Sequence, residues 1–195
     1  MREILYQGLM QHPIYFSGQF LLATPGMADR RFERSIIAIC SHDEHGALGI
    51  NIGQISKDIT FHAILDQFDI SAGECEDELV YVGGPVEMHR GFVLHSLDFN
   101  LSETLQVGDR WGLSSSLEIL EAIVAGKGPR NWMIATGYAG WGAGQLEEEL
   151  TQNGWSVTPG NTDWLFQSGE TDKWHMAWQE QGIDPGRLSG QFGSA

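Results

Sequence analysis

The sequence predicts a single domain of mixed α/β type, in the α+β class, with a twisted mixed β-sheet that curls towards a pseudo-barrel and helices packed outside it. Its 195 residues suit one domain, and a hydrophobic fraction of 42% is typical of a globular chain that buries a sizeable core. Short apolar runs and stretches with helical spacing follow one another without a strict strand-helix alternation.

The first part of the chain predicts an arm followed by three strands. Residues 1–17 precede the first apolar run and form an N-terminal arm, either flexible or docked, and residues 18–195 form the domain. Pro25 and Gly26 end the first strand, and the polar residues 42–46 connect the second strand to the third as a hairpin does. The three strands are expected at residues 19–23, 36–40 and 47–52.

The middle of the chain predicts two helices around a second group of strands. Asp58 is expected to cap a helix that runs to Phe68, and the acidic residues 71–77 form a loop. A serine among residues 114–116 caps a second helix, which Gly126 ends. Strands are expected at residues 79–82, 91–97 and 109–114, the first two flanking a turn at 83–85.

The last part of the chain predicts a buried strand at residues 131–136, because its apolar run lacks polar alternation. A helix is expected from about Ala143 to Asn153, and residues 155–157 and 164–166 are candidate late strands. Asp172 then starts a final helix with an apolar face of Trp174, Ala177 and Trp178.

The glycine-rich stretch 137–144 lies between the buried strand and its helix, and such a turn can bind phosphate. Its glycine order matches neither the dinucleotide fingerprint nor a P-loop, and three glutamates at 147–149 would repel an anion. We therefore interpret it as a corner that allows tight strand-to-helix packing.

This stretch, GYAGWGAGQLEEEL, followed by Asn153 and Trp155, resembles the signature of the YqgE/AlgH family of small bacterial proteins. Further motifs occur in the same order, and the resemblance covers roughly residues 18–195. They are FLLATPGM at 20–27, FERS at 32–35, Cys40 with His42, GALG at 46–49, GGPV at 83–86, RGFVLH at 90–95 and GID at 182–184.

The resemblance implies the curled sheet but no reaction, because the family has no assigned biochemical mechanism. Two positions depart from its pattern. Gly53 stands where the family usually has Asn, and the usual Gly-His-Ala ending reads Gly193-Ser194-Ala195. If either family residue carries chemistry, this chain lacks it.

Charge and composition indicate which kinds of partner and cellular location are expected for this chain. A formal net charge of −15, with only 11 scattered basic residues, opposes binding to a phosphate backbone, so we expect no nucleic-acid partner and disfavour a transcriptional regulator. The N-terminus offers neither a signal core nor a membrane span. Two cysteines, Cys40 and Cys75, make no disulfide framework, so cytoplasmic residence without membrane contact is expected.

The segment from Cys40 to His45 holds thiol, imidazole and carboxylate groups, which are all metal ligands. A polar turn explains them better, because no second cluster of ligands follows. Cys40 lies within an apolar run, where a buried and inert thiol is the usual case. We expect no metal and no cofactor.

For function, the sequence favours a non-catalytic binding or regulatory module for a small molecule or a protein partner. Polar and aromatic residues gather at the ends of predicted strands, where α/β proteins place ligands. Trp141 is expected to be partly exposed because glycines flank it. The expected binding crevice consists of Gly83, Gly84, Pro85, Val86, Arg90, His95, Tyr138, Trp141 and Gln145.

An enzyme is the alternative, of hydrolase type, with His95 or His42 acting beside a glutamate such as Glu147. It requires an imidazole and a carboxylate within hydrogen-bonding distance in a concave site. No nucleophile elbow of the form G-x-S-x-G is present, so the sequence assigns no catalytic residue.

Overall fold

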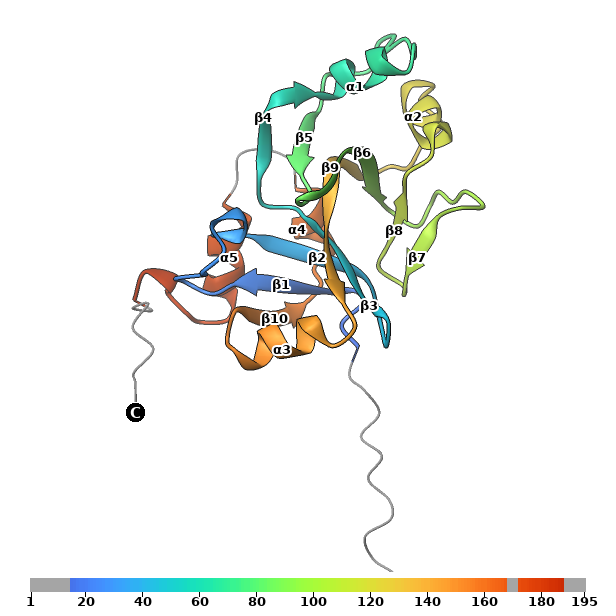
Figure 1. The fold of residues 1–195 in the computed structure, drawn as a ribbon. Coiled ribbons are helices and arrows are strands. Elements are labelled where there is room, and N and C mark those ends of the chain that lie inside the picture. The colour runs from blue at the N-terminus through green and yellow to red at the C-terminus, as the bar shows by residue number, and fades with distance from the viewer. Residues whose placement is uncertain (1–14, 168–171, 188–195) are drawn as a thin grey trace, which may run out of the picture.

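The computed structural model describes residues 15–167 and 172–187, and it contains one curled sheet of ten strands (Figure 1). The strand order is β10-β1-β2-β3-β9-β6-β8-β7, with β5 beside β9 and β4 beyond β5. Only the β5–β9 pair is parallel among the described strands. The strands are β1 Gln19–Ala23, β2 Ile36–Asp43, β3 Gly46–Asn51, β4 Ile55–Thr60, β5 Leu79–Val82, β6 Val86–His95, β7 Leu105–Val107, β8 Trp111–Ser114, β9 Trp132–Gly142 and β10 Trp155–Pro159.

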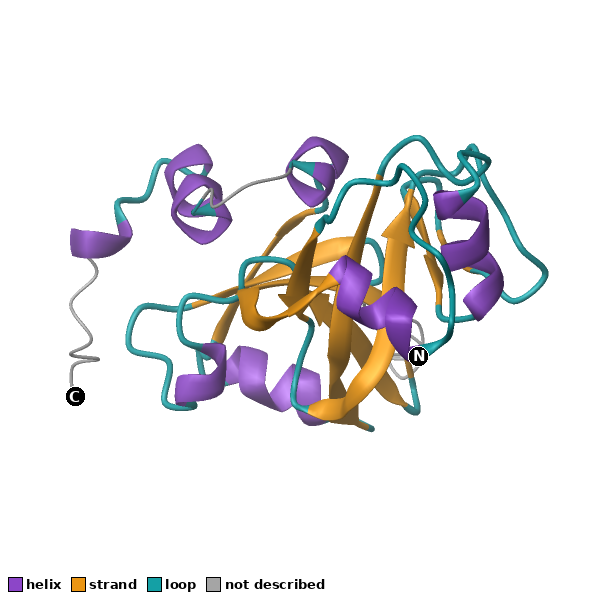
Figure 2. Cartoon of the chain, turned by 90° about the horizontal axis from the view of Figure 1, so that it is seen from above, coloured by secondary structure: helices purple, strands orange, loops and turns teal. Residues whose placement is uncertain are grey.

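Five α-helices lie around the strands, which occupy the middle of the molecule when it is seen from above (Figure 2). In Figure 1, α1 and α2 are at the top, α3 is beside β10, and α4 and α5 are at the side of β1 and β2. The helices are α1 Phe61–Gln67, α2 Leu117–Val124, α3 Gln145–Thr151, α4 Thr162–Phe166 and α5 Lys173–Glu180, and two short 3₁₀ turns are η1 Arg30–Phe32 and η2 Pro185–Arg187.

The strands β1 and β2 are buried on both faces and separate two cores. Phe20 and Leu22 point into the core that α4 and α5 close, while Leu21 packs on the opposite face, in the core that α3 covers. Alternate side chains of a strand point to opposite faces, so a continuous apolar run supplies both cores. A third core lies under α1 and α2, where Ile64 and Leu120 pack on β5, β6 and β9.

The strand β9 belongs to both parts of the sheet, because it pairs with β5 and β6 through its first half and with β3 through its second half. The change of partner occurs at Gly137, whose φ is +70°. A Cβ at Gly137 would lie 2.4 Å from the carbonyl oxygen of Gly84. A Cβ at Gly83 would lie 2.3 Å from the oxygen of Gly137. Backbone packs directly on backbone here, which only glycine allows.

The predicted fold class is confirmed, since a mixed sheet curls towards a barrel with helices outside it. The strands expected in the first 52 residues and at 79–82 are confirmed with shifts of a few residues, and so are the helices at 117 and 173. Strand β6 begins five residues earlier than expected, at Val86. The short strand β7 carries no pattern long enough to predict it.

Three predicted elements are wrong. Asp58 does not cap a helix: residues 55–60 form β4, which pairs with β5, and Thr60 caps α1 by accepting from the Ala63 N–H. The glycine-rich corner is strand, because β9 bends at Gly137 and continues to Gly142 along β3. Residues 164–166 are helical, since the Asn161 side chain caps α4.

Gly137→Ala should lower the free energy of unfolding by about 3 kcal/mol or more, because alanine adds left-handed strain and a clash with backbone that cannot rotate away. The matched control is Gly91→Ala on the neighbouring strand, where an added Cβ meets no atom within 4 Å. Urea unfolding of both variants checks this, and equal midpoints would contradict the proposed crossing constraint.

Candidate functional site

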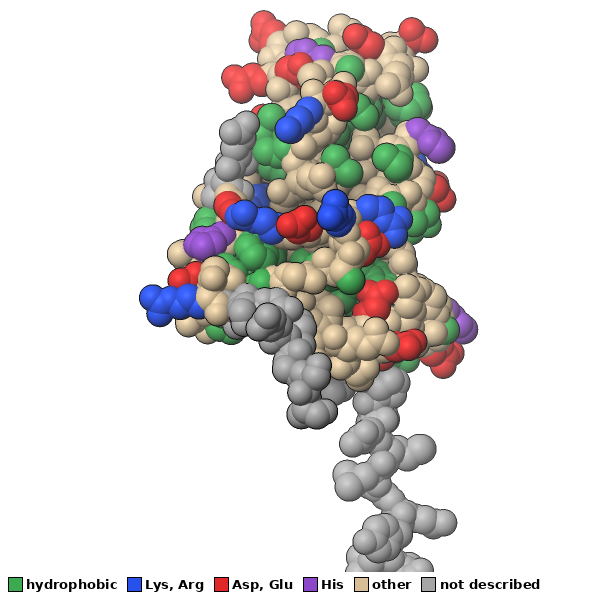
Figure 3. Space-filling model, turned by 60° about the vertical axis from the view of Figure 1, so that its left-hand side comes forward, with side chains coloured by type: hydrophobic (Ala, Val, Ile, Leu, Met, Phe, Trp, Pro, Cys, Tyr) green, Lys and Arg blue, Asp and Glu red, His purple; other side chains and the backbone are tan. Residues whose placement is uncertain are grey.

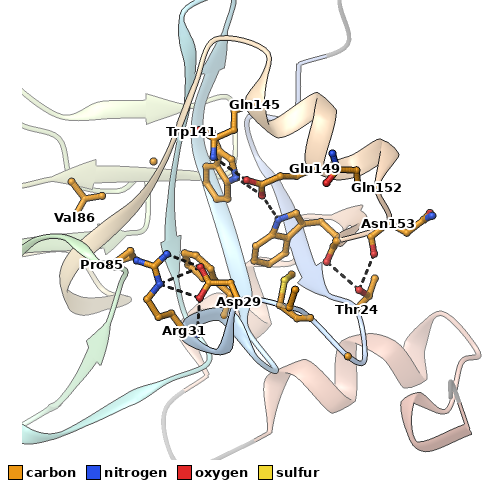
Figure 4. Close-up of a pocket in the computed structure, with 17 residues that line it drawn as sticks. Thr24, Asp29, Arg31, Pro85, Val86, Trp141, Gln145, Glu149, Gln152 and Asn153 are labelled. Atoms are coloured by element: carbon orange, nitrogen blue, oxygen red, sulfur yellow. Dashed lines mark hydrogen bonds and ion pairs between the residues drawn. The ribbon is translucent and has the colours of Figure 1, made fainter. Parts of the chain in front are cut away.

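A large cleft lies where the loop after β1, the start of β6, the end of β9 and α3 meet (Figure 4). Its volume is about 570 Å³, and its lining combines aromatic rings, amides and three charged side chains. We call it the tryptophan cleft. The lining residues are Thr24, Gly26, Met27, Ala28, Asp29, Arg31, Phe32, Pro85, Val86, Gly140, Trp141, Gln145, Glu149, Gln152, Asn153, Gly154 and Trp155.

The carboxylate of Glu149 organises one wall of the tryptophan cleft. Its Oε2 accepts from the indole Nε1–H of Trp141 at 2.9 Å and from that of Trp155 at 2.8 Å. Its Oε1 accepts from the side-chain amide of Gln145 at 2.9 Å, one helical turn earlier. In Figure 4, Trp141 and Gln145 both point towards this carboxylate. Two indoles on adjacent segments are thus fixed by one acceptor.

A charged pair, Asp29 and Arg31, lies at the end of the tryptophan cleft near Pro85 (Figure 4). Asp29 accepts from the Arg31 backbone N–H and from its guanidinium, with a shortest side-chain distance of 2.6 Å. The side-chain hydrogen bond from Arg31 lowers the pKa of Asp29 below its usual value. Since the two charges neutralise each other, this end of the cleft carries no net charge.

The predicted crevice residues occupy several places rather than one. Four of the nine, Pro85, Val86, Trp141 and Gln145, line the tryptophan cleft. Trp141 is only 7% exposed, so the expectation that it is partly exposed is wrong: its indole is held against Glu149 and Trp155. Gly83 and Gly84 form the backbone crossing with β9 instead. A binding role for these residues stays a prediction.

Arg90 and Tyr138 line a smaller cleft of about 210 Å³ beside β8. Arg90 also borders an apolar groove of about 460 Å³ between α1 and α2. Its guanidinium donates to Glu87 at 3.0 Å and to the Ser115 hydroxyl at 2.9 Å, and it lies 5.0 Å from the centre of the Phe92 ring. Through these partners, Arg90 links the bulged start of β6 to the residues just before α2. This structural role is sufficient to explain an arginine at position 90.

His95 is fully buried and takes part in a chain of hydrogen bonds. The Leu101 N–H donates to Thr104 Oγ1, which lies 2.8 Å from Ser114 Oγ, and Ser114 Oγ lies 3.0 Å from His95 Nε2. His95 Nδ1 lies 3.1 Å from the Ser96 carbonyl oxygen, an acceptor, so the proton is on Nδ1 and Ser114 donates to Nε2. Every donor in the chain has an acceptor.

Burial lowers the pKa of His95 below its ordinary value, which keeps the ring neutral. Its partners are a hydroxyl and a carbonyl, not the glutamate that the enzyme hypothesis required. Of the serines at 114–116, one of which was expected to cap the helix, Ser116 occupies the N-cap position of α2, but its side chain makes no capping hydrogen bond.

His42 does meet a glutamate, with Nε2 3.0 Å from Glu147 Oε1 on α3. Its Nδ1 accepts from the Phe16 backbone N–H at 3.1 Å, so the proton is on Nε2 and is donated to the carboxylate. The imidazole side chain is 1% exposed, and the rings of Tyr15 and Phe16 lie against it. A substrate has no access to the buried imidazole, whose contacts fix the end of the N-terminal arm to the sheet.

Several cleft residues were missed from the sequence, among them Glu149, Trp155 and the Asp29–Arg31 pair. The Gln145–Glu149 spacing of four residues was a usable signal, because it places both side chains on one helix face. The pairing of β10 with β1, which brings Trp155 beside Trp141, is a long-range contact that no local pattern encodes.

Other sequence expectations concern metals, thiols and the chain end. Burial raises the pKa of the Cys40 thiol to about 12, in agreement with an inert buried cysteine. Within residues 15–167 and 172–187, no three His, Cys, Asp or Glu side chains are grouped to hold a metal ion. Gly53 packs near Ile36, and a Cβ there would lie 2.9 Å from its Cγ2. The divergent ending at 193–195 lies outside the described residues.

Comparison with known proteins gives consistent matches across nearly the whole chain. Residues 20–186 match the AlgH-like family. A UPF0301 protein from Novosphingobium aromaticivorans is 48% identical, covering 95% of this chain and 100% of its own, and one from Rhizorhabdus wittichii is 45% identical with the same coverage.

Solved structures match over a similar extent. The AlgH protein from Pseudomonas aeruginosa is similar with a TM-score of 0.77 and 36% identity, covering 94% of this chain and 98% of that one. A protein from Corynebacterium diphtheriae has a TM-score of 0.72 and 21% identity, covering 94% and 95%, which shows a shared fold alone.

Glu149→Ala should lower the free energy of unfolding by about 2 kcal/mol, because two indole N–H groups lose their acceptor. The control is Glu148→Ala, an exposed position on the same helix, with an expected change within about 0.5 kcal/mol. Chemical denaturation followed by tryptophan fluorescence measures both. Equal stabilities would show that the indoles do not depend on Glu149.

The neutral His95 ring predicts a pH dependence of stability. Because its pKa is lowered in the folded state, the unfolded chain binds the proton more readily, so stability is fully present above pH 6.5 and is lost as the pH falls below it. The slope of the stability profile that one such group contributes is at most about 1.4 kcal/mol per pH unit. His95→Gln should flatten the profile below pH 6.5 relative to the unchanged protein. Parallel profiles would contradict it.

Proposed function

The chain belongs to the AlgH-like family, and from that premise we propose that it is a non-catalytic module that binds a small molecule in the tryptophan cleft. The observation that carries the proposal is a pair of indoles, Trp141 and Trp155, held by the single carboxylate of Glu149. A wall fixed before the ligand arrives loses little side-chain freedom on binding.

The dimensions and lining of the cleft support a small ligand. Its volume of about 570 Å³ lies within the range of about 300–1,000 Å³ that is usual for such sites. Apolar rings offer contact area, while Gln152 and Asn153 offer amide groups that can fix orientation. The Thr24 hydroxyl donates to the Asn153 carbonyl at 2.8 Å and holds the two cleft loops together.

The surroundings of His42 and His95 support a non-catalytic role. Tyr15 and Phe16 cover the His42 ring, and the His95–Ser114 pair is buried and fully hydrogen-bonded. Neither pair lines the tryptophan cleft. Both pairs are explained by the contacts that they make inside the fold.

We propose no nucleic-acid partner and a cytoplasmic location. Figure 3 shows acidic side chains at the top of the molecule, over α1 and the loop that follows it. Six exposed carboxylates lie between residues 66 and 78 without a lysine or arginine among them, and they would repel a phosphate backbone. Cys40 and Cys75 are free thiols, as is usual in reducing compartments. No helix within the described residues is long and apolar enough to cross a membrane.

Two cleft-filling variants test the proposal, Val86→Trp on β6 and Ala28→Trp on the loop after β1, because both positions line the tryptophan cleft and are solvent-exposed. Thermal unfolding is measured against nucleotides, small acids, amines and divalent metals. A ligand at about 100 times its dissociation constant adds roughly 2.7 kcal/mol, a shift of several degrees. The variants should lose that shift.

Leu97→Trp is the control, since Leu97 is 38% exposed and does not line the tryptophan cleft. It should keep the ligand-induced shift of the unchanged protein. A shift that survives both filling variants would place binding elsewhere, and a panel without any shift would count against a small-molecule module.

A further inference from the structure

We infer that the ligand of the tryptophan cleft is a small organic cation, an alkylated ammonium. The inference rests on the proposed function, because it names the chemical class that the same cleft would bind. It is carried by two independent features of the lining. One is an uncompensated negative charge, and the other is a set of three aromatic rings at steep angles.

The negative charge belongs to Glu149. The cleft lining contains three charged side chains, and two of them, Asp29 and Arg31, neutralise each other. The hydrogen-bond partners of Glu149 are two indole N–H groups and one amide, all of them uncharged donors. Among the described residues, no lysine or arginine forms an ion pair with it. The cleft therefore has one unit of negative charge that an arriving cation can balance.

The three rings are those of Phe32, Trp141 and Trp155. Trp141 and Trp155 have centroids 6.1 Å apart and planes at 78°, and Phe32 and Trp155 are 5.6 Å apart at 68°. Rings packed edge to face present both negative faces and positive edges, and all three residues line the tryptophan cleft. Cations bind over aromatic faces, and aromatic residues are the usual means of recognising quaternary ammonium groups. The Arg31 guanidinium already lies 5.8 Å from the Phe32 centroid.

The hydrogen bonds that Glu149 already accepts favour an alkylated ammonium over an ammonium with free N–H groups. A carboxylate offers about four acceptor positions, and three of those on Glu149 are taken by protein donors. It can thus supply charge but little further hydrogen bonding. A primary ammonium would lose its hydration without replacement, whereas methyl groups on nitrogen spread the charge and pack against rings.

An anionic ligand fits the same lining poorly. The one cationic group in the lining, Arg31, has its guanidinium engaged by Asp29. An anion would have to displace Asp29 and also approach Glu149, and the net charge of −15 opposes its entry. The chain as a whole attracts small cations to its surface for the same reason.

The test compares choline with 3,3-dimethyl-1-butanol, which has the same shape but carbon in place of the charged nitrogen. Both are titrated into the ¹⁵N-labelled full chain, and the indole Nε1–H resonances of Trp141 and Trp155 report on the site itself. Choline should shift both resonances in a saturable manner at millimolar concentration. The neutral alcohol should bind at least about tenfold more weakly, because the cation–π and charge contributions are absent.

Two variants separate charge from shape. Glu149→Gln keeps a carbonyl acceptor for the indoles and removes the charge, so choline affinity should fall at least about tenfold while the alcohol is unaffected. Glu148→Gln removes a charge from the same helix outside the cleft lining and keeps a carbonyl acceptor for the Gln152 amide, so it should change choline affinity by less than about twofold. Dispersed indole resonances in the unliganded variants establish that the fold is intact.

Equal affinity for choline and the alcohol would overturn the cation assignment while leaving the proposed binding module in place. If choline shifted neither indole resonance, the cation assignment would also be overturned. The thermal-unfolding panel of nucleotides, acids, amines and metals would then test the proposed binding function separately. If Glu149→Gln and Glu148→Gln weakened choline affinity equally, choline would be attracted by the overall negative charge. That result would contradict a specific cation site at Glu149.

Discussion

The crossing of two backbones at Gly83, Gly84 and Gly137 is the constraint on which the rest of the structure depends. It lets β9 leave β5 and β6 and continue along β3, so that one strand serves both parts of the sheet. The three cores are therefore parts of one sheet rather than of two separate units. The crossing also places the cleft, because Pro85 and Val86 follow Gly84 directly and Trp141 lies four residues beyond Gly137. Close backbone packing and the position of the candidate site have the same origin.

Polar groups are used in two different ways in this fold. Around His95, a linear chain of hydroxyls ends on a carbonyl, and every donor is matched, which makes the group rigid and closed to solvent. Around Glu149, three neutral donors converge on a charged acceptor at the edge of a cleft. The first arrangement has no unbalanced charge, so it stabilises the fold and offers nothing to a ligand. The second retains a net charge that solvent or a ligand can meet.

Much of the fold followed from local pattern. Apolar runs such as residues 36–40 predicted buried strands, and the spacing of Trp174, Ala177 and Trp178 predicted a helix with one buried face. The failures share a cause, since tertiary pairing overrode local preference. Residues 55–60 pair with β5 as strand β4 instead of starting a helix, and β9 extends through three glycines because β3 supplies a partner. The candidate site was only partly predictable. Trp141 and Gln145 lie in one conspicuous stretch, but Glu149 is one of three adjacent glutamates, and only the packing of β10 against β1 distinguishes it.

Most side chains of the short helix α3 make a specific contact with another part of the fold. Within five residues, Gln145 accepts from the Gly142 N–H, Leu146 enters the core, Glu147 binds His42 and Glu149 binds the two indoles. Each contact leaves the helix in its own direction, and successive residues are rotated by about 100° around the axis. Insertion or deletion of a single residue would turn all later side chains away from their partners at once. The length of α3 is therefore less free to change than its composition at an exposed position such as Glu148, whose carboxylate accepts from the nearby Gln152 amide at 3.2 Å.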